Sequence, residues 1–200
     1  IYGATGNGKS MVSTLKMIKR IFQAKVHEKN FILAGKDITT LEKRFINSDY
    51  SVLNWRPFKG KWVYKKQGVG GAKVIFKTKT GDKYLYLTPF NNKDAYSSIL
   101  GNTLNGVFVD EAVEADDLFL QEIVSRVNRT DGTWAIFTSN GGDPNSFFYT
   151  GLVNKCKTVD EHPEFKETFI TTNFLQYASE EEKEKYKHLP IVKSAPIEEV

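Results

Sequence analysis

The sequence predicts an α/β fold, in which a parallel β-sheet is flanked by helices. Short apolar runs of strand length recur along the chain and alternate with helical patterns, as expected for such a sheet. A glycine-rich turn near the start leads directly into a helical pattern. Residues 61–90 instead alternate polar and apolar side chains between glycine turns, and this predicts an antiparallel β excursion from the sheet.

The glycine-rich turn spans residues 3–10 and has the pattern G-x-x-x-x-G-K-S, which is typical of a phosphate-binding loop (P-loop). Its glycines allow the backbone to approach an anion, and successive N–H groups can then surround the phosphate oxygens. The pattern predicts that Lys9 reaches the β- and γ-phosphates and that the Ser10 hydroxyl binds Mg²⁺. The predicted nucleotide-binding residues of the loop are Gly3, Ala4, Thr5, Gly6, Asn7, Gly8, Lys9 and Ser10. The alternative is a chance glycine-rich turn.

The elements next to this loop follow from apolar spacing. After the loop, apolar residues recur at helical intervals from Met11 to Phe22. Residues 30–35 form a short apolar run and predict a buried strand, and residues 37–46 predict a helix capped by Asp37 or Thr39. Because two residues precede the loop and the chain does not begin with Met, we expect an excerpt of a longer protein whose first strand is missing.

The net charge of +4 permits nucleic acid as a partner without requiring it. Basic residues are concentrated between Arg56 and Lys83, where Asp82 is the single acid and aromatic residues from Trp55 to Phe76 lie between the lysines. This composition suits a surface that binds a phosphate backbone. It equally suits a solvated face of β-hairpins, whose lysines discourage edge pairing. The sequence has no apolar run of about 18 residues, so we expect no membrane span.

Two acids follow the apolar run Val107–Val109, and the carboxyl ends of parallel strands are where ligands bind. We predict that Asp110 holds Mg²⁺, directly or through water, and that Glu111 orients and deprotonates a water that attacks the γ-phosphate. The alternative is a helix start with acids in its first turn. A P-loop combined with these acids favours nucleoside triphosphate hydrolysis over phosphoryl transfer between small molecules.

Another strand, Trp134–Phe137, leads into Thr138, Ser139 and Asn140, which could detect the γ-phosphate by hydrogen bonding. The alternative is an ordinary transition from strand to loop, because strong turn residues follow. Further on, residues 165–172 predict a fourth strand and residues 180–188 a charged surface helix. The single cysteine, Cys156, suggests a reducing compartment.

Several segments together resemble the ATPase domain of the large terminase subunit, the DNA-packaging motor of tailed phages and prophages. They are GATGNGKS, ILGNTLNGVFVDEA, VSRVNR and FTSNGGDPNSFFY, in the order that the family uses, over residues 1 to about 175. The resemblance implies an ASCE-type P-loop NTPase that uses ATP and Mg²⁺ to move double-stranded DNA into a procapsid. It also implies a portal protein and a small terminase subunit as partners, a homo-oligomeric ring, and the cytoplasm of the bacterial host as location. Gly106 is typical of the family, and its coupling motif falls on Thr138, Ser139 and Asn140.

The chain departs from many family members because its P-loop contains no arginine. We therefore expect Arg126 or Arg129 to be the arginine finger that stabilises the transition state, acting on a neighbouring subunit. The alternative for both is solvation on a helix surface. After residue 150 the sequence has no cluster of metal-binding acids, so we expect residues 1–200 to form an ATPase domain that does not cut DNA. Two other functions stay open: another P-loop nucleic-acid ATPase of helicase or recombination type, and a nucleotide-binding assembly module with vestigial hydrolysis.

Overall fold

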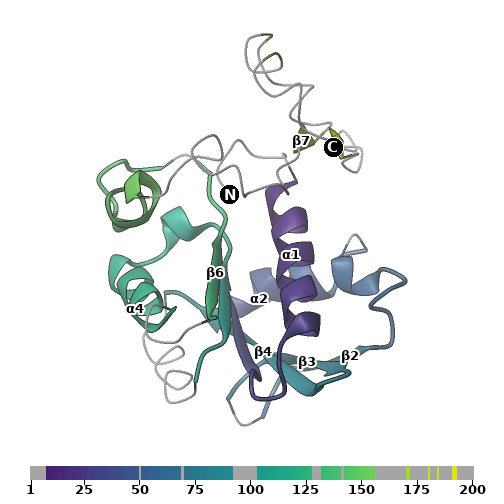
Figure 1. Ribbon diagram of the computed structural model, residues 1–200. Helices are drawn as coiled ribbons and strands as arrows, with labels where there is room; N and C mark the ends of the chain where they lie inside the picture. The colour runs from purple at the N-terminus through teal and green to yellow at the C-terminus, as the bar shows by residue number, and fades with distance from the viewer. Residues whose placement is uncertain are drawn as a thin grey trace.

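A six-stranded sheet with the strand order β2-β3-β4-β1-β5-β6 forms the centre of the molecule (Figure 1). The computed structural model describes residues 8–49, 51–68, 70–91, 103–127, 132–140, 142–155, 170–171, 180, 184 and 191–192. The strands of this sheet are β1 (Asn30–Gly35), β2 (Trp62–Lys65), β3 (Lys73–Thr78), β4 (Gly81–Pro89), β5 (Gly106–Val109) and β6 (Trp134–Phe137).

The strand directions confirm the predicted mixture of parallel and antiparallel pairing. Strand β1 runs parallel to both β4 and β5, and β5 runs parallel to β6. Strand β3 is antiparallel to its neighbours β2 and β4. The excursion predicted at residues 61–90 is therefore part of the main sheet, because its last strand pairs with β1 in parallel over the whole length of β1, from Asn30 opposite Tyr84 to Gly35 opposite Pro89.

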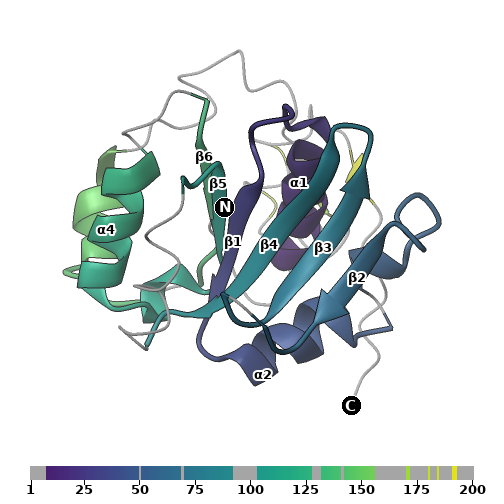
Figure 2. The same cartoon turned by 90° about the horizontal axis from the view of Figure 1, so that it is seen from below.

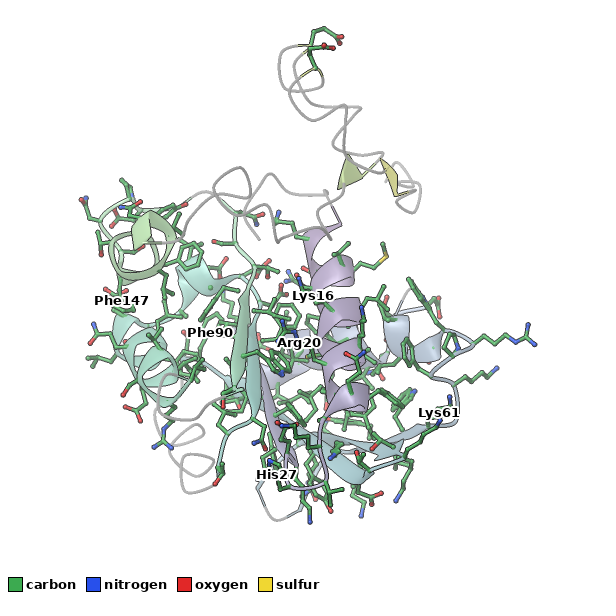
Figure 3. The ribbon with its side chains drawn as sticks, in the orientation of Figure 1. Lys16, Arg20, His27, Lys61, Phe90 and Phe147 are labelled. Atoms are coloured by element: carbon green, nitrogen blue, oxygen red, sulfur yellow. The ribbon has the colours of Figure 1, made fainter. Side chains whose placement is uncertain are left out.

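Helices cover both faces of the sheet, with α1 (Lys9–Gln23) on one side and α4 (Asp117–Val127) on the other (Figure 2). The alternation of side chains along β1 explains this arrangement. Phe31 and Leu33 belong to the apolar core that α1 covers, whereas Ile32 and Ala34 belong to the core that α4 covers. Burial of a large apolar side chain contributes about 1.5–3 kcal/mol, so both faces must be covered. Figure 3 shows Phe90 in the second core, where its ring lies 6.2 Å from that of Phe119.

The helix predicted at residues 37–46 is divided into two kinds of helical turn. Asp37 caps α2 (Ile38–Leu41) by accepting a 2.7 Å hydrogen bond from the backbone N–H of Thr40. A π-helical turn, η1 (Glu42–Ile46), then follows without a break. Its wider winding is visible in the bond from Asn47 N to Glu42 O, which spans five residues at 2.8 Å. π-Turns inside helices are rare and are frequent at functional sites.

The remaining described elements are short. They are η2 (Val52–Asn54), η3 (Ala112–Glu114), η4 (Phe148–Leu152), η5 (Val153–Lys155), β7 (Ile170–Thr171) and β8 (Ile191–Val192). The strand predicted at residues 165–172 is present only as β7 among the described residues, and it pairs with β8 in a separate two-stranded sheet. Of the helix predicted at residues 180–188, Glu180 and Glu184 are described, and both are helical. Among the described residues, no helix has the length and apolar character that a membrane span requires.

Candidate active site

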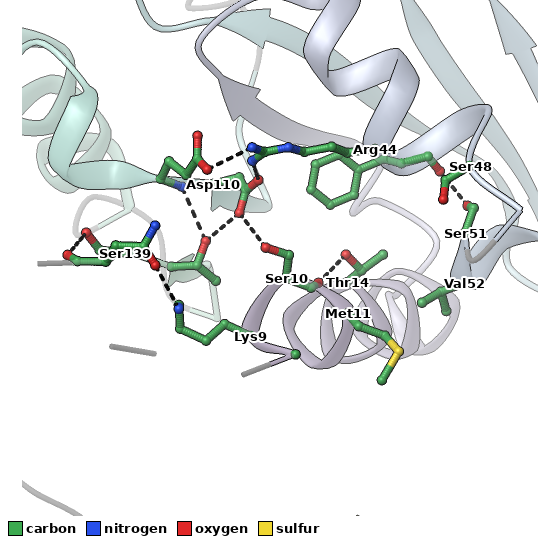
Figure 4. A pocket seen from close by; sticks show the side chains of 15 residues that line it. Lys9, Ser10, Met11, Thr14, Arg44, Ser48, Ser51, Val52, Asp110 and Ser139 are labelled. Atoms are coloured by element: carbon green, nitrogen blue, oxygen red, sulfur yellow. Dashed lines mark hydrogen bonds and ion pairs between the residues drawn. The ribbon is translucent and has the colours of Figure 1, made fainter. Parts of the chain in front are cut away.

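A pocket of about 450 Å³ lies where the carboxyl ends of β5 and β6 meet the first turn of α1 (Figure 4). This volume is in the range of ordinary small-ligand sites. The pocket brings together three segments that the sequence analysis selected independently. The predicted site residues that line it are Gly8, Lys9, Ser10, Asp110, Glu111, Thr138, Ser139 and Asn140.

The first turn of α1 contributes the basic and hydroxyl groups of the P-loop motif. Gly8 is the N-cap and has a φ of 71°, a left-handed conformation that glycine adopts without a steric penalty. Lys9 Nζ donates to Oδ1 of Asn140 at 2.9 Å, and the Ser10 hydroxyl donates to Oδ1 of Asp110 at 2.9 Å. Partial burial lowers the pKa of Lys9, although the nearby charges of Asp110 and Glu111 act in the opposite direction.

Asp110 is the most enclosed acid of the pocket, with 3% of its side chain exposed. Its Oδ1 accepts hydrogen bonds from the hydroxyls of Ser10 and Thr138, at 2.9 and 2.6 Å. Its Oδ2 accepts from a terminal nitrogen of Arg44 at 2.9 Å. Burial of an ionised carboxylate is costly unless it is paired and hydrogen-bonded, and here both oxygens are satisfied.

Glu111 has a backbone conformation that is unusual for a residue with a side chain. Its φ is 55° and its ψ 46°, and it is the one non-glycine residue with a positive φ in the part of the chain that the structure describes. Such conformations cost about 1–3 kcal/mol and are concentrated at functional sites. The turn points the carboxylate into the pocket, where it is 26% exposed. The short helix η3 follows directly, so the acids lie both at a strand end and before a helical turn.

Arg44 is the charged lining residue of this pocket that the sequence did not predict. Its two terminal nitrogens contact Oδ2 of Asp110 at 2.9 Å and Oε1 of Glu111 at 2.8 Å (Figure 4). Partial burial by itself would lower the pKa of Arg44, but hydrogen bonds and charge from Glu111 and Asp110 outweigh it and raise the pKa. Nothing in the local sequence marks this arginine, because it lies in a segment that predicts only a helix.

The remaining predicted site residues are Arg126, Arg129 and the first five residues of the loop. Arg126 is on α4, outside the pocket, and its Nε is 2.7 Å from Oε1 of Glu122, one helical turn earlier. Its expected role on a neighbouring subunit stays a prediction. Arg129 and the loop residues Gly3, Ala4, Thr5, Gly6 and Asn7 lie outside the described residues. Ser139, which does line the pocket, is buried and donates to the backbone carbonyl of Asn140 at 2.8 Å.

The basic segment proves to be divided between structural and exposed lysines. Lys83 is fully buried, and its ammonium donates to the backbone carbonyl of Lys25. Lys66 and Lys77 pair with Glu42 and Asp82, at 3.3 and 2.8 Å. The other exposed basic residues of this segment are Arg56, Lys59, Lys61, Lys65 and Lys79, which together are named the exposed basic surface. Figure 3 shows Lys61 at the outer edge of the molecule, pointing away from the core.

The donors in the pocket fit a magnesium ion. Ser10 Oγ and Asp110 Oδ1 are hard oxygen donors 2.9 Å apart, and Mg²⁺ is ordinarily held by one or two protein oxygens together with substrate phosphates and water. Within the described ranges, the structure has no group of three or more His, Cys, Asp or Glu side chains that could hold a metal by themselves.

Comparison with solved structures finds this fold in the large terminases of bacteriophages. The chain is similar to the large terminase from a thermophilic bacteriophage, with 23% identity, a TM-score of 0.63, and coverage of 93% of this chain and 43% of that one. A structure of the same phage protein in complex with ADP gives 24% identity, a TM-score of 0.58, and coverage of 92% and 43%. The chain thus spans less than half the length of that large terminase.

A second relative is the ATPase domain of the large terminase of Thermus phage P74-26. It has 14% identity and a TM-score of 0.54, over 94% of this chain and 86% of that one. No protein-family model matches the sequence, and no curated protein matches it. The structural likenesses show that this chain has the fold of a large-terminase ATPase domain.

Proposed function

We propose that this chain is the ATP-hydrolysing motor domain of a viral terminase large subunit, which couples hydrolysis to movement of double-stranded DNA into a procapsid. One observation carries the proposal: Lys9 and Ser10 from the P-loop motif share a single pocket with Asp110 and Glu111, 100 residues further along the chain. Convergence of a P-loop with an acidic strand end is the arrangement that positions a triphosphate against an activated water.

Each residue has a role that follows from its chemistry. Lys9 would bind the β- and γ-phosphates, and the backbone of Gly3, Ala4, Thr5, Gly6, Asn7 and Gly8 would surround them. Ser10 and Asp110 would hold Mg²⁺, which when bound neutralises charge on the phosphate oxygens. Glu111 would accept the proton of the attacking water. Thr138, Ser139 and Asn140 would sense the γ-phosphate by hydrogen bonding, and two of them are already tied to the site, since Thr138 contacts Asp110 and Asn140 contacts Lys9.

The fold relatives support ATP as the nucleotide. The large terminase of the thermophilic bacteriophage has been solved with ADP and with ATP-gamma-S, and the P74-26 domain is described as an ATPase domain. Because the likeness is one of fold, nucleotide binding by this chain is inferred from the residues of its own pocket. Lys9, the two proposed magnesium ligands and the proposed base all line that pocket.

An arginine acting from a neighbouring subunit would complete the site, and Arg126 and Arg129 are the proposed candidates. A finger of this kind typically contributes about 10³–10⁵ in rate. Alanine at each position should lower the DNA-stimulated ATPase of the assembled ring and leave nucleotide binding by the single chain unchanged. Unchanged turnover in the assembled ring for both variants would remove both residues as candidates.

The exposed basic surface is the proposed contact for the phosphate backbone of duplex DNA. Replacement of Lys59, Lys61 and Lys65 by glutamine should weaken DNA binding and flatten the dependence of log K on log salt by about 0.9 for each phosphate that is no longer neutralised. A portal protein, a small terminase subunit and further copies of this chain are the expected partners in the cytoplasm of a bacterial host. An unchanged salt slope would place the DNA contact on another surface.

The decisive experiment measures nucleotide binding and turnover separately. The wild-type chain should bind ATP-gamma-S in the presence of Mg²⁺ and hydrolyse ATP, and Glu111→Ala should bind the analogue with little change but lose turnover. Equal turnover in wild type and Glu111→Ala would contradict the assignment of the base. Binding without any hydrolysis, even in the assembled complex, would support the vestigial assembly module instead.

A second measurement separates a packaging motor from a helicase. A motor of the proposed kind should show ATPase activity that procapsid portal and duplex DNA stimulate. It should not unwind a forked duplex. Unwinding that needs no portal would favour the helicase or recombination alternative.

A further inference from the structure

Arg44 connects the two acids of the candidate active site through a single guanidinium group. One terminal nitrogen lies 2.9 Å from Oδ2 of Asp110 and the other 2.8 Å from Oε1 of Glu111. The planar guanidinium presents its donors in a fixed geometry, so two contacts from one group also fix the distance between the two carboxylates. A lysine ammonium at the same position could supply the charge but could not impose that geometry.

The need for such a group follows from the chain itself. Asp110 and Glu111 are consecutive residues whose carboxylates both line the pocket, and like charges this close disfavour one another. The hydroxyl contacts of Asp110, from Ser10 and Thr138, reach only its Oδ1. Lys9 also places positive charge near both acids, but its ammonium donates to Asn140. The guanidinium of Arg44, in contrast, contacts both carboxylates directly.

The backbone that carries Arg44 is itself held in place. Arg44 lies in the π-helical turn η1, and Glu42 at the start of this turn is buried. The hydroxyl of Tyr64 on β2 donates to Oε1 of Glu42, and Lys66 lies 3.3 Å from its Oε2. Phe45, next to Arg44, packs its ring edge-on against Phe108 of β5 at 5.7 Å. These contacts determine where the guanidinium can reach, although 43% of the Arg44 side chain is exposed.

We propose that Arg44 is a positioning residue of this site, and that its guanidinium holds Asp110 and Glu111 in the orientation that hydrolysis requires. The inference rests on the proposed function, because positioning has a consequence only if Glu111 acts on a water. Arg44 acts through the acids, so its loss should impair turnover more than nucleotide binding. Groups that orient the ligands of a site typically contribute about 10–100-fold to its activity.

The test compares Arg44→Gln, Arg44→Lys and the control Lys43→Gln, which removes a neighbouring exposed charge from the same turn. For each full chain, kcat for ATP and Kd for ATP-gamma-S with Mg²⁺ are measured, and circular dichroism reports the fold. We expect Arg44→Gln to lower kcat about 10–100-fold and to change Kd less than about threefold. Arg44→Lys should fall between Arg44→Gln and wild type, and Lys43→Gln should match wild type.

Three results would overturn the inference. An unchanged kcat in Arg44→Gln would show that the clamp on the acids has no role in turnover. A Kd raised more than about tenfold would make Arg44 a direct phosphate contact, since that change corresponds to about one strong charged hydrogen bond. Loss of the folded spectrum in both Arg44 variants would make the arginine a structural residue. If instead wild type neither binds ATP-gamma-S nor hydrolyses ATP, the proposed function itself fails, and this is visible before any variant is made.

Discussion

The hydroxyl of Thr138 donates a hydrogen bond of 2.6 Å to Oδ1 of Asp110, and this bond joins the end of β6 to the end of β5 inside the candidate active site. The backbone repeats the connection, because Thr138 N donates to Val109 O at 3.0 Å and Ala112 N donates to Thr138 O at 2.8 Å. The Thr138 hydroxyl also accepts a 3.3 Å bond from the N–H of Glu111. A shift at the end of β6 would therefore be transmitted to both acids.

The first prediction concerns this hydroxyl. Thr138→Val keeps the shape of the side chain but leaves Oδ1 of Asp110 with one hydroxyl donor in place of two. We expect ATPase activity to fall by about 10–100-fold, the usual effect of losing a group that orients a metal ligand. The matched control is Thr133→Val, which removes a hydroxyl that binds the Leu104 carbonyl near the opposite end of β6. If the two variants lose the same amount of ATPase activity, the loss comes from a general disturbance of β6 and not from the missing bond to Asp110.

The second prediction concerns the lysine of the P-loop motif. Lys9→Met removes the ammonium that would contact the phosphates, and a charged hydrogen bond of this kind contributes about 1.5–3 kcal/mol, or about 10–100-fold in affinity. We expect Kd for ATP-gamma-S to rise by this factor in a titration with Mg²⁺. Lys16→Met, on the exposed face of the same helix, serves as the control and should bind as wild type does. Full affinity in Lys9→Met would contradict the assignment of the pocket to a nucleotide.

The third prediction concerns the close packing of β5 against β6. A Cβ atom on Gly106 would lie 2.2 Å from Cε2 of Trp134, so even alanine forces the indole or the strand to move. Overpacking of this kind costs about 1–3 kcal/mol, and we expect thermal unfolding of Gly106→Ala at a lower Tm.

A compensating change makes this prediction specific. Trp134→Leu removes the atoms that Gly106→Ala would meet, so the double variant should be more stable than the sum of the two single losses implies. Strict additivity of the unfolding free energies would show that the indole is not the obstacle.

The fourth prediction is a pH dependence from the pair formed by Tyr64 and Glu42. The hydrogen bond from Tyr64 lowers the pKa of Glu42 below its usual 4.5, and Lys66 adds to this, whereas burial acts in the opposite direction. A carboxylate whose pKa is lower in the folded state contributes stability above its unfolded pKa and loses it as the pH falls. Burial and the same bond raise the pKa of Tyr64 above its usual value of 10. The stability that Tyr64 contributes is therefore fully present below pH 10 and is lost as the pH rises through its folded-state pKa.

Tyr64→Phe isolates this contribution from other titrating groups. Near pH 7 the free energy of unfolding of the variant should be about 1 kcal/mol smaller than that of wild type, and its Tm should be lower. The difference between the two proteins should narrow as the pH falls below about 4.5, where Glu42 becomes protonated in the unfolded chain. A difference that stays constant from pH 7 to pH 3 would mean that the two side chains do not interact in solution.

Much of the site could be predicted from the sequence because its parts are local patterns. The spacing of Gly8, Lys9 and Ser10 defines a loop within ten residues, and the apolar run before Asp110 defines a strand end in the same way. The carboxyl ends of parallel strands lie at one edge of a sheet, and this brings Asp110 and Thr138, each at the end of its strand, close together. The structure confirms that they are in contact.

The winding of residues 37–46 could be predicted only in part. Asp37 is a cap by residue type, and the structure confirms it. The sequence did not predict the change to a π-turn at Glu42, whose carboxylate is held by Tyr64 and Lys66, about 22 residues further along the chain. Intrinsic helix propensity is a weak guide where such tertiary contacts compete with it.

The sequence by itself therefore determined the phosphate-loop pattern, the strand that ends in two acids, and the mixed α/β class. Only the tertiary structure decided that Arg44 faces those acids. Arg44 is 66 residues away from Asp110 along the chain, and the two meet because β1 pairs with β5 in register and the turn after β1 folds back over the end of the sheet. No local pattern encodes a contact that depends on strand order, and this is why Arg44 was not among the residues that the sequence predicted for the site.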